Sequence, residues 1–465
     1  MIAWCTRWVN GTIRIPGTYA DPTTAYQHVH EPDAPEKRHV AIAILPFDDT
    51  SDGADQAHLG EGIAAELIGS LSSVQGLRVA SRTSAFASRS RFPDAREFAR
   101  SLGAEFLLHG SVYEAEGPVH LDARLVRVAD GSELWSGSYE RGQGDIFEIR
   151  ASLAHGVVEA LGLEPDERGR RALGRIDTRD PAAYDLCLRA RRHFFQSHRK
   201  GIQAASELFL KAIAQDPNYA RAYAGMAECS AYRHMYFGGD AADLDGARWA
   251  SQQALKLDPE LAEAHAARGL VATLEEHFAD ADQAFETALH LNPNLYEAHY
   301  FRARTFFAQG NLEAAARWFR SAAEVDPAEY QAHGLLGFVS ASLGRTEEAE
   351  TARRQALCNV ERRLEQHPED TRALYLGADA LLGLGDAARA SEWAERVLAI
   401  APDDPYVRYG LACLYSKMSE PSKALDHLEA SLRAGFAHRE WIDNDSDLDS
   451  IRNETRYRLL VDTLI

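Results

Sequence analysis

A period of about 34 residues, marked by proline, runs through the carboxyl-terminal two thirds of this 465-residue chain. Six prolines each follow an apolar, helix-like stretch, and the intervals between them are 42, 34, 34, 41 and 34 residues. The two longer intervals exceed 34 by about two helical turns. Such a period predicts supersecondary units that stack, because one unit alone cannot bury its apolar face. The prolines are Pro217, Pro259, Pro293, Pro327, Pro368 and Pro402.

Small residues recur in phase with these prolines. Alanine stands twelve positions before all six of them, and alanine or glycine stands ten positions after them. Two helices can approach closely where neither carries a bulky side chain, so the phase predicts tightly packed helix pairs. The residues after the prolines are Ala227, Gly269, Ala303, Gly337, Ala378 and Ala412.

This spacing resembles the tetratricopeptide repeat, which has small residues at fixed points of two helices and a proline near the end of each unit. The resemblance covers about residues 181–435 and implies an all-α solenoid, a right-handed superhelix with a concave groove. Where the period is interrupted, we expect residues 236–246 to lengthen a loop and residues 358–370 to lengthen a helix. The seven expected pairs are 181–217, 218–259, 260–293, 294–327, 328–368, 369–402 and 403–435, followed by a capping tail over 436–465.

The periodicity upstream predicts an α/β domain over residues 38–165, joined to the repeats by a linker over 166–180. Apolar, β-branched runs at 39–47 and 77–82 are typical of buried strands. Helical spacing at 55–74, 94–103 and 146–162 alternates with these strands and with three more candidates at 104–115, 120–130 and 133–141. The expected order is therefore βαβαβββα.

This domain resembles the TolB-like amino-terminal domain that is fused to tetratricopeptide repeats in bacterial signalling proteins. That family implies an interaction or sensing module without established catalytic residues, often behind a DNA-binding, kinase or cyclase domain. Residues 1–37 are too few for such a domain, and we expect them to form a leader or linker. The resemblance rests on Leu45-Pro46-Phe47, Gly62, Glu66-Leu67, Ser81 to Ser84, Gly110-Ser111-Val112, Asp130-Gly131, Leu134-Trp135-Ser136, Tyr139 and Asp145-Ile146-Phe147.

The net charge and the cysteine pattern indicate which classes of partner and which cellular compartment to expect. Seventy acidic and 50 basic residues give a formal charge of −20, which argues against a nucleic-acid partner. No apolar run approaches the ~20 residues of a membrane span. Five scattered cysteines without a CxxC pair favour a reducing compartment, so we expect a cytoplasmic protein.

No common catalytic or cofactor motif is present, so we expect neither an enzyme nor a bound cofactor or metal ion. The sequence lacks GxSxG, GxxxxGK[ST] and HExxH. Gly60-x-Gly62-x-x-Ala65 resembles a dinucleotide fingerprint, but a long loop separates it from the preceding predicted strand, which favours an ordinary helix start. Small-molecule or nucleotide binding near Gly60–Glu66 and Arg82–Ser84 stays open as an alternative.

Two charged segments have plain interpretations. Five acidic residues of the tail fall on calcium-loop positions, but Leu448 stands where that loop needs glycine, so a capping turn is favoured. The basic run over 189–200 is expected to be a solvated face. The five acidic residues are Asp443, Asp445, Asp447, Asp449 and Glu454.

The repeat resemblance implies a partner-binding groove lined by the first helix of each pair. Aromatic and arginine residues at the groove positions are the usual anchors of a binding surface. The positions that correspond to the carboxylate clamp of chaperone-binding relatives lack its lysine and asparagine, which argues against a chaperone carboxyl terminus as ligand. The predicted groove residues are Tyr232, Glu263, Glu297, Tyr300, Arg304, Phe307, Gln331, Phe338, Arg372, Tyr375, Asp379, Tyr406 and Tyr409, with Arg221, Glu228 and Lys417 at further groove positions.

The sequence thus favours a non-enzymatic scaffold or adaptor that binds a protein or peptide in this groove, and it is compatible with a homo-oligomer. The alternative is the sensor half of a bacterial signalling protein, of the transcriptional regulator, kinase or adenylate cyclase type, without its output domain.

Overall fold

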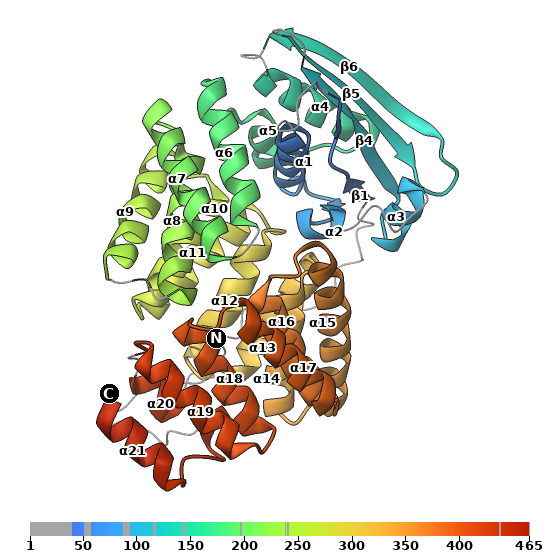
Figure 1. Cartoon of the computed structure of the whole chain (residues 1–465). Coiled ribbons are helices and arrows are strands. Elements are labelled where there is room, and N and C mark those ends of the chain that lie inside the picture. The colour runs from blue at the N-terminus through green and yellow to red at the C-terminus, as the bar shows by residue number, and fades with distance from the viewer. Residues whose placement is uncertain are drawn as a thin grey trace, which may run out of the picture.

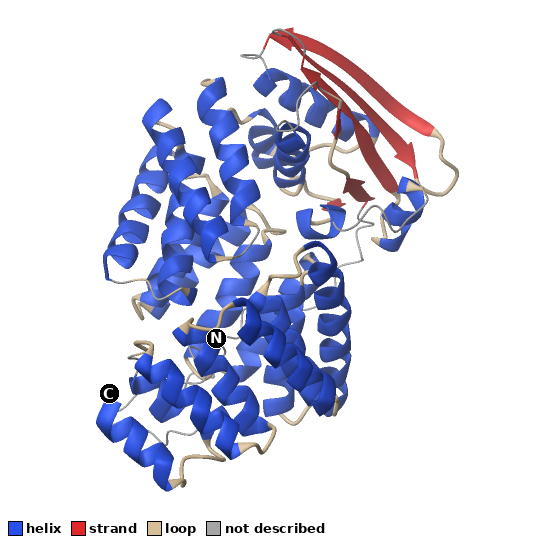
Figure 2. Ribbon diagram, viewed as in Figure 1, coloured by secondary structure: helices blue, strands red, loops and turns tan. Residues whose placement is uncertain are grey.

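An α/β region and a helical solenoid make up the computed structural model of the chain (Figure 1). Strands occur only in the first of these two parts among the described residues (Figure 2). The expected leader over 1–37 lies outside the described residues. The structure describes residues 40–50, 57–86, 94–114, 118–142, 146–195, 198–237, 239, 241–436 and 439–464.

The sheet has the strand order β3-β1-β4-β5-β6, and the short strand β2 pairs with β4. Strand β1 runs parallel to β3 and β4, whereas β4, β5 and β6 form an antiparallel meander. The strands appear in the expected order, and the two-residue β2 is an addition. Their bounds are β1 (Val40–Ile44), β2 (Asp48–Asp49), β3 (Leu77–Val79), β4 (Phe106–Glu114), β5 (Pro118–Arg127) and β6 (Glu133–Gly142).

Successive side chains along β1 point to opposite faces of the sheet, because side chains alternate in a strand. Ile42 and Ile44 join the core under helices α1 (Ala57–Leu71) and α4 (Ile146–Ala160). Ala43 and Leu45 join a smaller core with α3 (Ala95–Ser101). Helix α2 (Arg82–Phe86) is short and was not expected, and its first residue, Arg82, was the last of the strand predicted over 77–82.

Helix α5 (Glu167–Gly174) lies in the stretch that was expected to be a linker. Asp166 caps it, because its side chain accepts a hydrogen bond from the Gly169 amide at 2.7 Å. Leu173 of α5 is buried in the α/β core. The stretch between the two parts therefore adds one more helix to the α/β core before the solenoid begins at α6.

Each of the seven expected ranges holds two helices, which confirms the predicted helical solenoid. The expected long loop over 236–246 is wrong, because α9 already begins at Ala241, where Ala241, Ala242 and Leu244 favour helix. The pairs are α6 (Pro181–Phe194) with α7 (Arg199–Gln215), α8 (Ala220–Tyr236) with α9 (Ala241–Leu257), α10 (Ala262–Leu274) with α11 (Phe278–Leu291), α12 (Tyr296–Ala308) with α13 (Leu312–Val325), α14 (Tyr330–Ser342) with α15 (Thr346–Gln366), α16 (Thr371–Gly383) with α17 (Ala387–Ile400), and α18 (Pro405–Lys417) with α19 (Pro421–Arg433).

The phased prolines end the second helix of a pair, because proline has no amide hydrogen to continue it. A polar residue before the proline then turns the chain. The side chain of Asp216 accepts from the Asn218 amide at 2.9 Å, and that of Asn292 accepts from the Asn294 amide at 3.1 Å. The repeated Asp-Pro and Asn-Pro pairs are thus the turns between successive helix pairs.

Small residues let the two helices of a pair touch. An added Cβ at Gly377 of α16 would lie 2.1 Å from the Trp393 ring of α17, whereas an added Cβ at Gly334 of α14 would have its nearest atoms 3.9 Å away.

Gly377→Ala should therefore destabilise the protein by about 1–3 kcal/mol through overpacking. Gly334→Ala should be neutral or stabilising by roughly 0.5–1 kcal/mol, since alanine favours helix. Urea unfolding of both variants tests this, and equal effects would contradict it.

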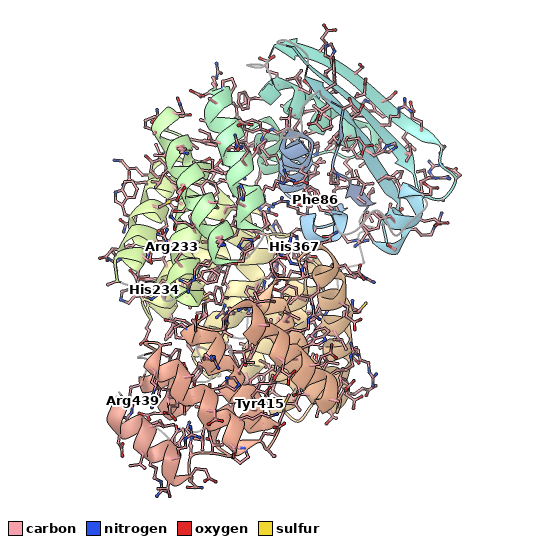
Figure 3. All side chains as sticks on the ribbon, in the orientation of Figure 1. Phe86, Arg233, His234, His367, Tyr415 and Arg439 are labelled. Carbon is pink, nitrogen blue, oxygen red and sulfur yellow. The ribbon has the colours of Figure 1, made fainter. Side chains whose placement is uncertain are left out.

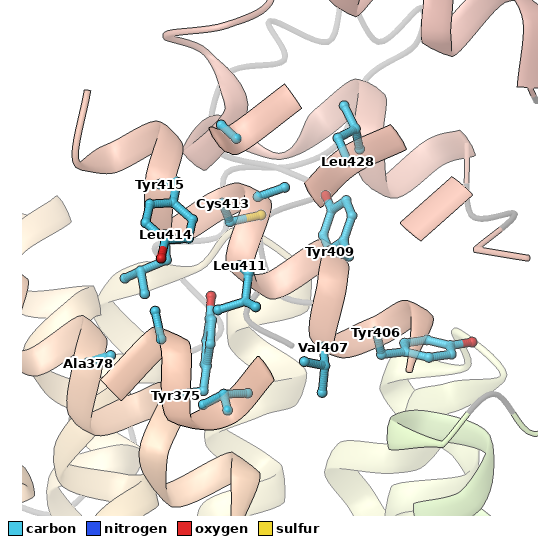
Figure 4. Packing of buried hydrophobic residues seen from close by; sticks show 14 of the residues in the cluster. Tyr375, Ala378, Tyr406, Val407, Tyr409, Leu411, Cys413, Leu414, Tyr415 and Leu428 are labelled. Carbon is cyan, nitrogen blue, oxygen red and sulfur yellow. The ribbon is translucent and has the colours of Figure 1, made fainter. Parts of the chain in front are cut away.

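The tail packs on the last helix pair through α20 (Arg439–Asn444), a 3₁₀ turn at Ser446–Leu448 and α21 (Thr455–Leu464). Ile442, Leu448 and Ile451 join the core of the last repeats. Figure 4 shows part of this core, where Tyr375 of α16 meets Leu411 of α18. No helix in the described part of the chain is both long enough and apolar enough to cross a membrane.

Candidate functional site

A cavity of about 480 Å³ lies between the α/β part and the inner wall of the solenoid. Helices α1 and α2 line one side, and α6, α8, α10, α12 and α15 line the other. Figure 1 shows α1 and α2 against the solenoid, between α6 and α15. Phe86 of α2 and His367 beyond α15 both line the cavity from opposite parts (Figure 3). A ligand here would touch both parts of the protein at once.

Helix α1 approaches α6 closely because Gly62 has no side chain. A Cβ at Gly62 would lie 2.4 Å from Leu188 of α6, and one at Gly60 would lie 2.2 Å from the Phe47 carbonyl oxygen. Both glycines lie inside α1, not in a turn between a strand and a helix. Gly60 and Gly62 therefore act as packing residues, whereas a dinucleotide site needs its glycines in the turn between a strand and a helix.

A buried ion pair of the α/β part is linked to the solenoid by a hydrogen bond from α6. Arg150 of α4 lies 3.0 Å from Glu66 of α1, and both side chains are less than 8% exposed. The Tyr184 hydroxyl of α6 donates to the same Glu66 oxygen at 2.9 Å. Asp177, in the segment before α6, lies 3.9 Å from Arg150. The contact between the two parts thus depends on charged groups that compensate one another.

The same network continues to the cavity wall. Arg221 of α8 pairs with Asp177 at 2.9 Å and with Glu263 of α10 at 2.5 Å. Burial alone would raise the pKa of Glu263, but Arg221 and Arg191 outweigh it and lower that pKa to about 2. Glu263 is therefore a firmly ionised, paired carboxylate.

Other carboxyl groups of the cavity have raised pKa values. Burial raises the pKa of Glu228 on α8 to about 8, against the opposing charge of Arg191. Burial also raises the pKa of Glu297 on α12. Burial raises the pKa of Glu329 to about 7, although the Tyr296 hydroxyl donates to it at 2.6 Å. The cavity thus combines ionised pairs with carboxyl groups that titrate near neutral pH.

Aromatic rings line the cavity on the solenoid side. Tyr296 and Tyr300 of α12 stack with ring centroids 5.6 Å apart. Tyr232 of α8 meets Phe301 edge-on at 5.9 Å and Phe194 of α6 at 4.9 Å. Aromatic faces beside a few polar groups are typical of ligand and partner sites.

The structure brings five of the thirteen predicted groove residues to this cavity. Arg221 and Glu228, at the further groove positions, also line it. The five are Tyr232, Glu263, Glu297, Tyr300 and Gln331.

The other eight predicted groove residues lie elsewhere in the solenoid, and their role in partner binding stays a prediction. Seven are buried, because successive helices pack their side chains together. Arg372, for example, donates to the Tyr300 hydroxyl at 3.0 Å and to Gln331 at 2.5 Å. The eight are Arg304, Phe307, Phe338, Arg372, Tyr375, Asp379, Tyr406 and Tyr409, of which Phe338 is half-buried.

Sequence reasoning missed several lining residues. Arg191 lies in the basic run that was expected to be a solvated face, yet it is half-buried and lines the cavity. Cys187 and Phe194 on the same helix are buried, and their spacing was a signal that one side of α6 faces inward. Arg82 follows β3, and no sequence pattern around it predicted that it would face the solenoid.

The acidic residues of the tail point to different partners. Asp443 pairs with Arg439 at 2.9 Å and Asp449 with Arg452 at 2.8 Å. They therefore do not converge with the other acids of the calcium-loop spacing.

Buried Asp445 and Asp447 lie beside Cys413, and the ligand atoms of these three are within 4.8 Å of one another. Among the described residues this trio is close enough to share a metal ion. Asp445 already accepts from the Tyr409 hydroxyl at 2.8 Å, and the Lys417 ammonium lies 3.9 Å from Asp447. The two carboxylates therefore already have a hydrogen-bond donor and a nearby cation from the protein itself.

A curated protein of Rhizobium meliloti (strain 1021), named "Putative adenylate cyclase 3", is 29% identical over 249 residues. The match covers 52% of this chain and 42% of that protein, so the chain spans less than half the length of this relative.

Solved structures of low identity resemble the chain. A tetratricopeptide repeat protein from Parabacteroides merdae is 17% identical, with a TM-score of 0.36 over 59% of this chain and all of that one. The human IFIT1 dimer with PPP-AAAA is 14% identical, with a TM-score of 0.44 over 66% of this chain and 68% of that one.

The sequence profile of the tetratricopeptide repeat matches residues 275–328 and 344–405. Both stretches lie inside the range where the proline period predicted these repeats. The prediction is confirmed there: the chain contains tetratricopeptide repeats within a helical solenoid.

Proposed function

We propose that this protein is a non-enzymatic regulatory scaffold that holds a segment of a partner protein in the cavity between its two parts. The observation that carries the proposal is the shared lining of that cavity by α1, α2 and the inner helices of the solenoid. A segment bound there would make contacts with both parts, so its binding would stabilise one arrangement of them. Tetratricopeptide repeats are stacked helix pairs whose inner surface suits such a partner.

In this proposal the α/β part is a TolB-like sensing module. Its α1 and α2 form one wall of the cavity, and Glu66 of α1, which pairs with Arg150, accepts a hydrogen bond from Tyr184 of the solenoid. The protein would act in the cytoplasm, alone or as a homo-oligomer.

A second candidate is the regulatory part of a signalling protein of the adenylate cyclase type. The observation that favours it is the name of the Rhizobium meliloti relative, of which this chain spans 42%. The genomic sequence before the codon for Met1 tests it. An in-frame cyclase, kinase or winged-helix sequence would support this candidate, and an unrelated upstream gene would oppose it.

Site-specific photo-cross-linking in the host cell tests the scaffold proposal. A photoreactive phenylalanine analogue replaces Phe86 in one variant and His367 in another, because both line the cavity from opposite parts. We expect the same partner to be captured at both positions and identified by mass spectrometry.

The matched control places the analogue at Trp249 on α9, which is 52% exposed and lies outside the cavity lining. A partner captured at Trp249 as efficiently as at Phe86 and His367 would contradict the proposal. Failure to capture any protein at the two cavity positions would contradict it as well.

A further inference from the structure

We propose that the cavity binds a small oxyanion, a carboxylate or a phosphate group, between the guanidinium groups of Arg82 on α2 and Arg191 on α6. This goes beyond the scaffold function, because it assigns a small-ligand site to one sector of the cavity. It draws on one residue from each part of the protein, so neither part could form the site alone.

Arg82 presents a donor that no described residue satisfies. Its guanidinium stacks on the Phe195 ring at 3.9 Å and lies 5.1 Å from the Phe86 ring centroid. The Nη1 atom is buried and has no hydrogen-bond partner among the described residues. The two rings hold the planar group by its faces, which leaves its edge for an acceptor.

Arg191 presents two such donors from the solenoid side. Its Nε and Nη2 atoms are buried and likewise have no hydrogen-bond partner among the described residues. Arg82 and Arg191 line the same cavity, and the pKa of Arg82 is lowered first by burial and further by the charge of Arg191. A buried donor without an acceptor is unfavourable, and two like charges repel, so an anion between them would relieve both costs.

Three other arginines of the cavity already have carboxylate partners, which favours the sector of Arg82 and Arg191 for an added anion. Arg221 pairs with Asp177 and Glu263, and Arg192 pairs with Glu61 at 3.6 Å. Arg363 pairs with Asp370 at 2.8 Å. The Tyr330 hydroxyl also lacks a partner, but its charged neighbours are Asp370, Glu329, Arg372 and Arg363.

Four carboxyl groups act on the two arginines, and two of the four are also paired with other arginines. Glu61 of α1 and Glu297 of α12 face Arg82, and Glu228 of α8 and Glu263 of α10 face Arg191. Glu61 and Glu263 are held by other arginines, Arg192 and Arg221. Burial raises the pKa of Glu228 to about 8, although the charge of Arg191 opposes this, and in its protonated form the carboxyl O–H would donate to an oxyanion.

Calorimetric titration of the full chain tests the site with sodium phosphate and with sodium succinate, each compared with sodium chloride at equal ionic strength. We expect at least one of the two oxyanions to bind and to raise the melting temperature, because a ligand of the native state stabilises it. Arg82→Gln and Arg191→Gln should each weaken binding about tenfold or more, since each removes a charge-assisted donor.

Arg354→Gln is the matched control. Arg354 is an exposed arginine of α15 that lies outside the cavity lining and pairs with Glu350 at 3.5 Å. This variant should bind the anion within about twofold of the wild type, because an exposed charge contributes little. Circular dichroism confirms the fold of all three variants, and the wild-type titration decides the proposal without any variant.

The outcomes separate the sources of the oxyanion. Tighter binding of phosphate identifies a phosphate ligand, and tighter binding of succinate identifies a carboxylate. Binding of neither, or an equal loss in Arg354→Gln, would overturn the proposal, as would binding of putrescine, a diamine, in their place. A partner protein captured at His367 without anion binding would overturn this inference alone and leave the scaffold function standing.

Discussion

Replacing Arg150 by methionine should lower the free energy of unfolding by about 3–5 kcal/mol, which is the usual cost of breaking a buried ion pair. Arg150 and Glu66 are 5% and 7% exposed, so water cannot take over the role of the lost guanidinium. Methionine keeps much of the length of the arginine side chain and removes its charge. Glu66 would then remain buried without its cation, whereas Asp177 would keep its pair with Arg221.

The same variant should loosen the α/β part from the solenoid. The Tyr184 hydroxyl donates to Glu66 from α6, and Asp177 lies before that helix, so both parts share the damaged network. We expect faster proteolysis in the stretch 166–180 together with a lower urea midpoint. Limited proteolysis and urea unfolding of wild type and variant measure the two effects.

A double-mutant cycle isolates the interaction. Glu66→Gln in the Arg150→Met background should recover part of the loss, with a coupling of about 1–3 kcal/mol. The control is Arg354→Met, because Arg354 and Glu350 form an ion pair with side chains 71% and 51% exposed. An exposed pair contributes less than about 1 kcal/mol. Equal losses in Arg150→Met and Arg354→Met would contradict the role of the buried pair.

The helical part could be predicted from the sequence because its signals are local. An Asp-Pro or Asn-Pro turn lies within a few residues of the helix that it ends, as at Asp216 and Asn292. The small residues that permit helix crossing, such as Gly269 opposite Phe285, recur ten positions after the prolines of those turns. Each helix pair therefore has its own local sequence signals, and these signals recur along the solenoid.

The cavity could not be predicted in the same way, because its walls come from residues far apart in the chain. Arg82 and Arg191 are more than a hundred positions apart, and no local pattern relates them. The repeat resemblance also implies an open inner wall, whereas Arg372 reaches across to Tyr300 and fills part of it. The position of α1 and α2 over the solenoid is a property of tertiary packing that no repeat template contains.

Replacing Glu228 by glutamine should stabilise the protein at pH 9 and leave its stability nearly unchanged at pH 5. Burial raises the pKa of Glu228 to about 8 in the folded protein, from an ordinary value of 4.5. Between these two pH values the folded state binds more protons at this carboxyl than the unfolded chain does. The free energy of unfolding of the wild type therefore falls as the pH rises through this window.

The expected change in the free energy of unfolding follows from the difference between the folded and unfolded pKa values of Glu228. One pKa unit corresponds to about 1.4 kcal/mol, so ionisation of buried Glu228 should lower the free energy of unfolding by on the order of 4 kcal/mol by pH 9. Glutamine has the same shape and no charge, and it should recover roughly 2–4 kcal/mol of this at pH 9. Urea unfolding of both proteins at pH 5, 7 and 9 measures the difference.

Two further variants distinguish this effect from a general response to losing a negative charge. Glu286→Gln changes an exposed carboxylate of α11 and should show no pH-dependent difference from the wild type. Glu263→Gln should have the opposite sign and destabilise the protein at pH 7, because the pKa of Glu263 is lowered to about 2 and Arg221 would lose its partner. If the Glu228→Gln and wild-type stabilities stay parallel from pH 5 to pH 9, Glu228 is already ionised in the fold, and the neutral carboxyl beside Arg191 is wrong.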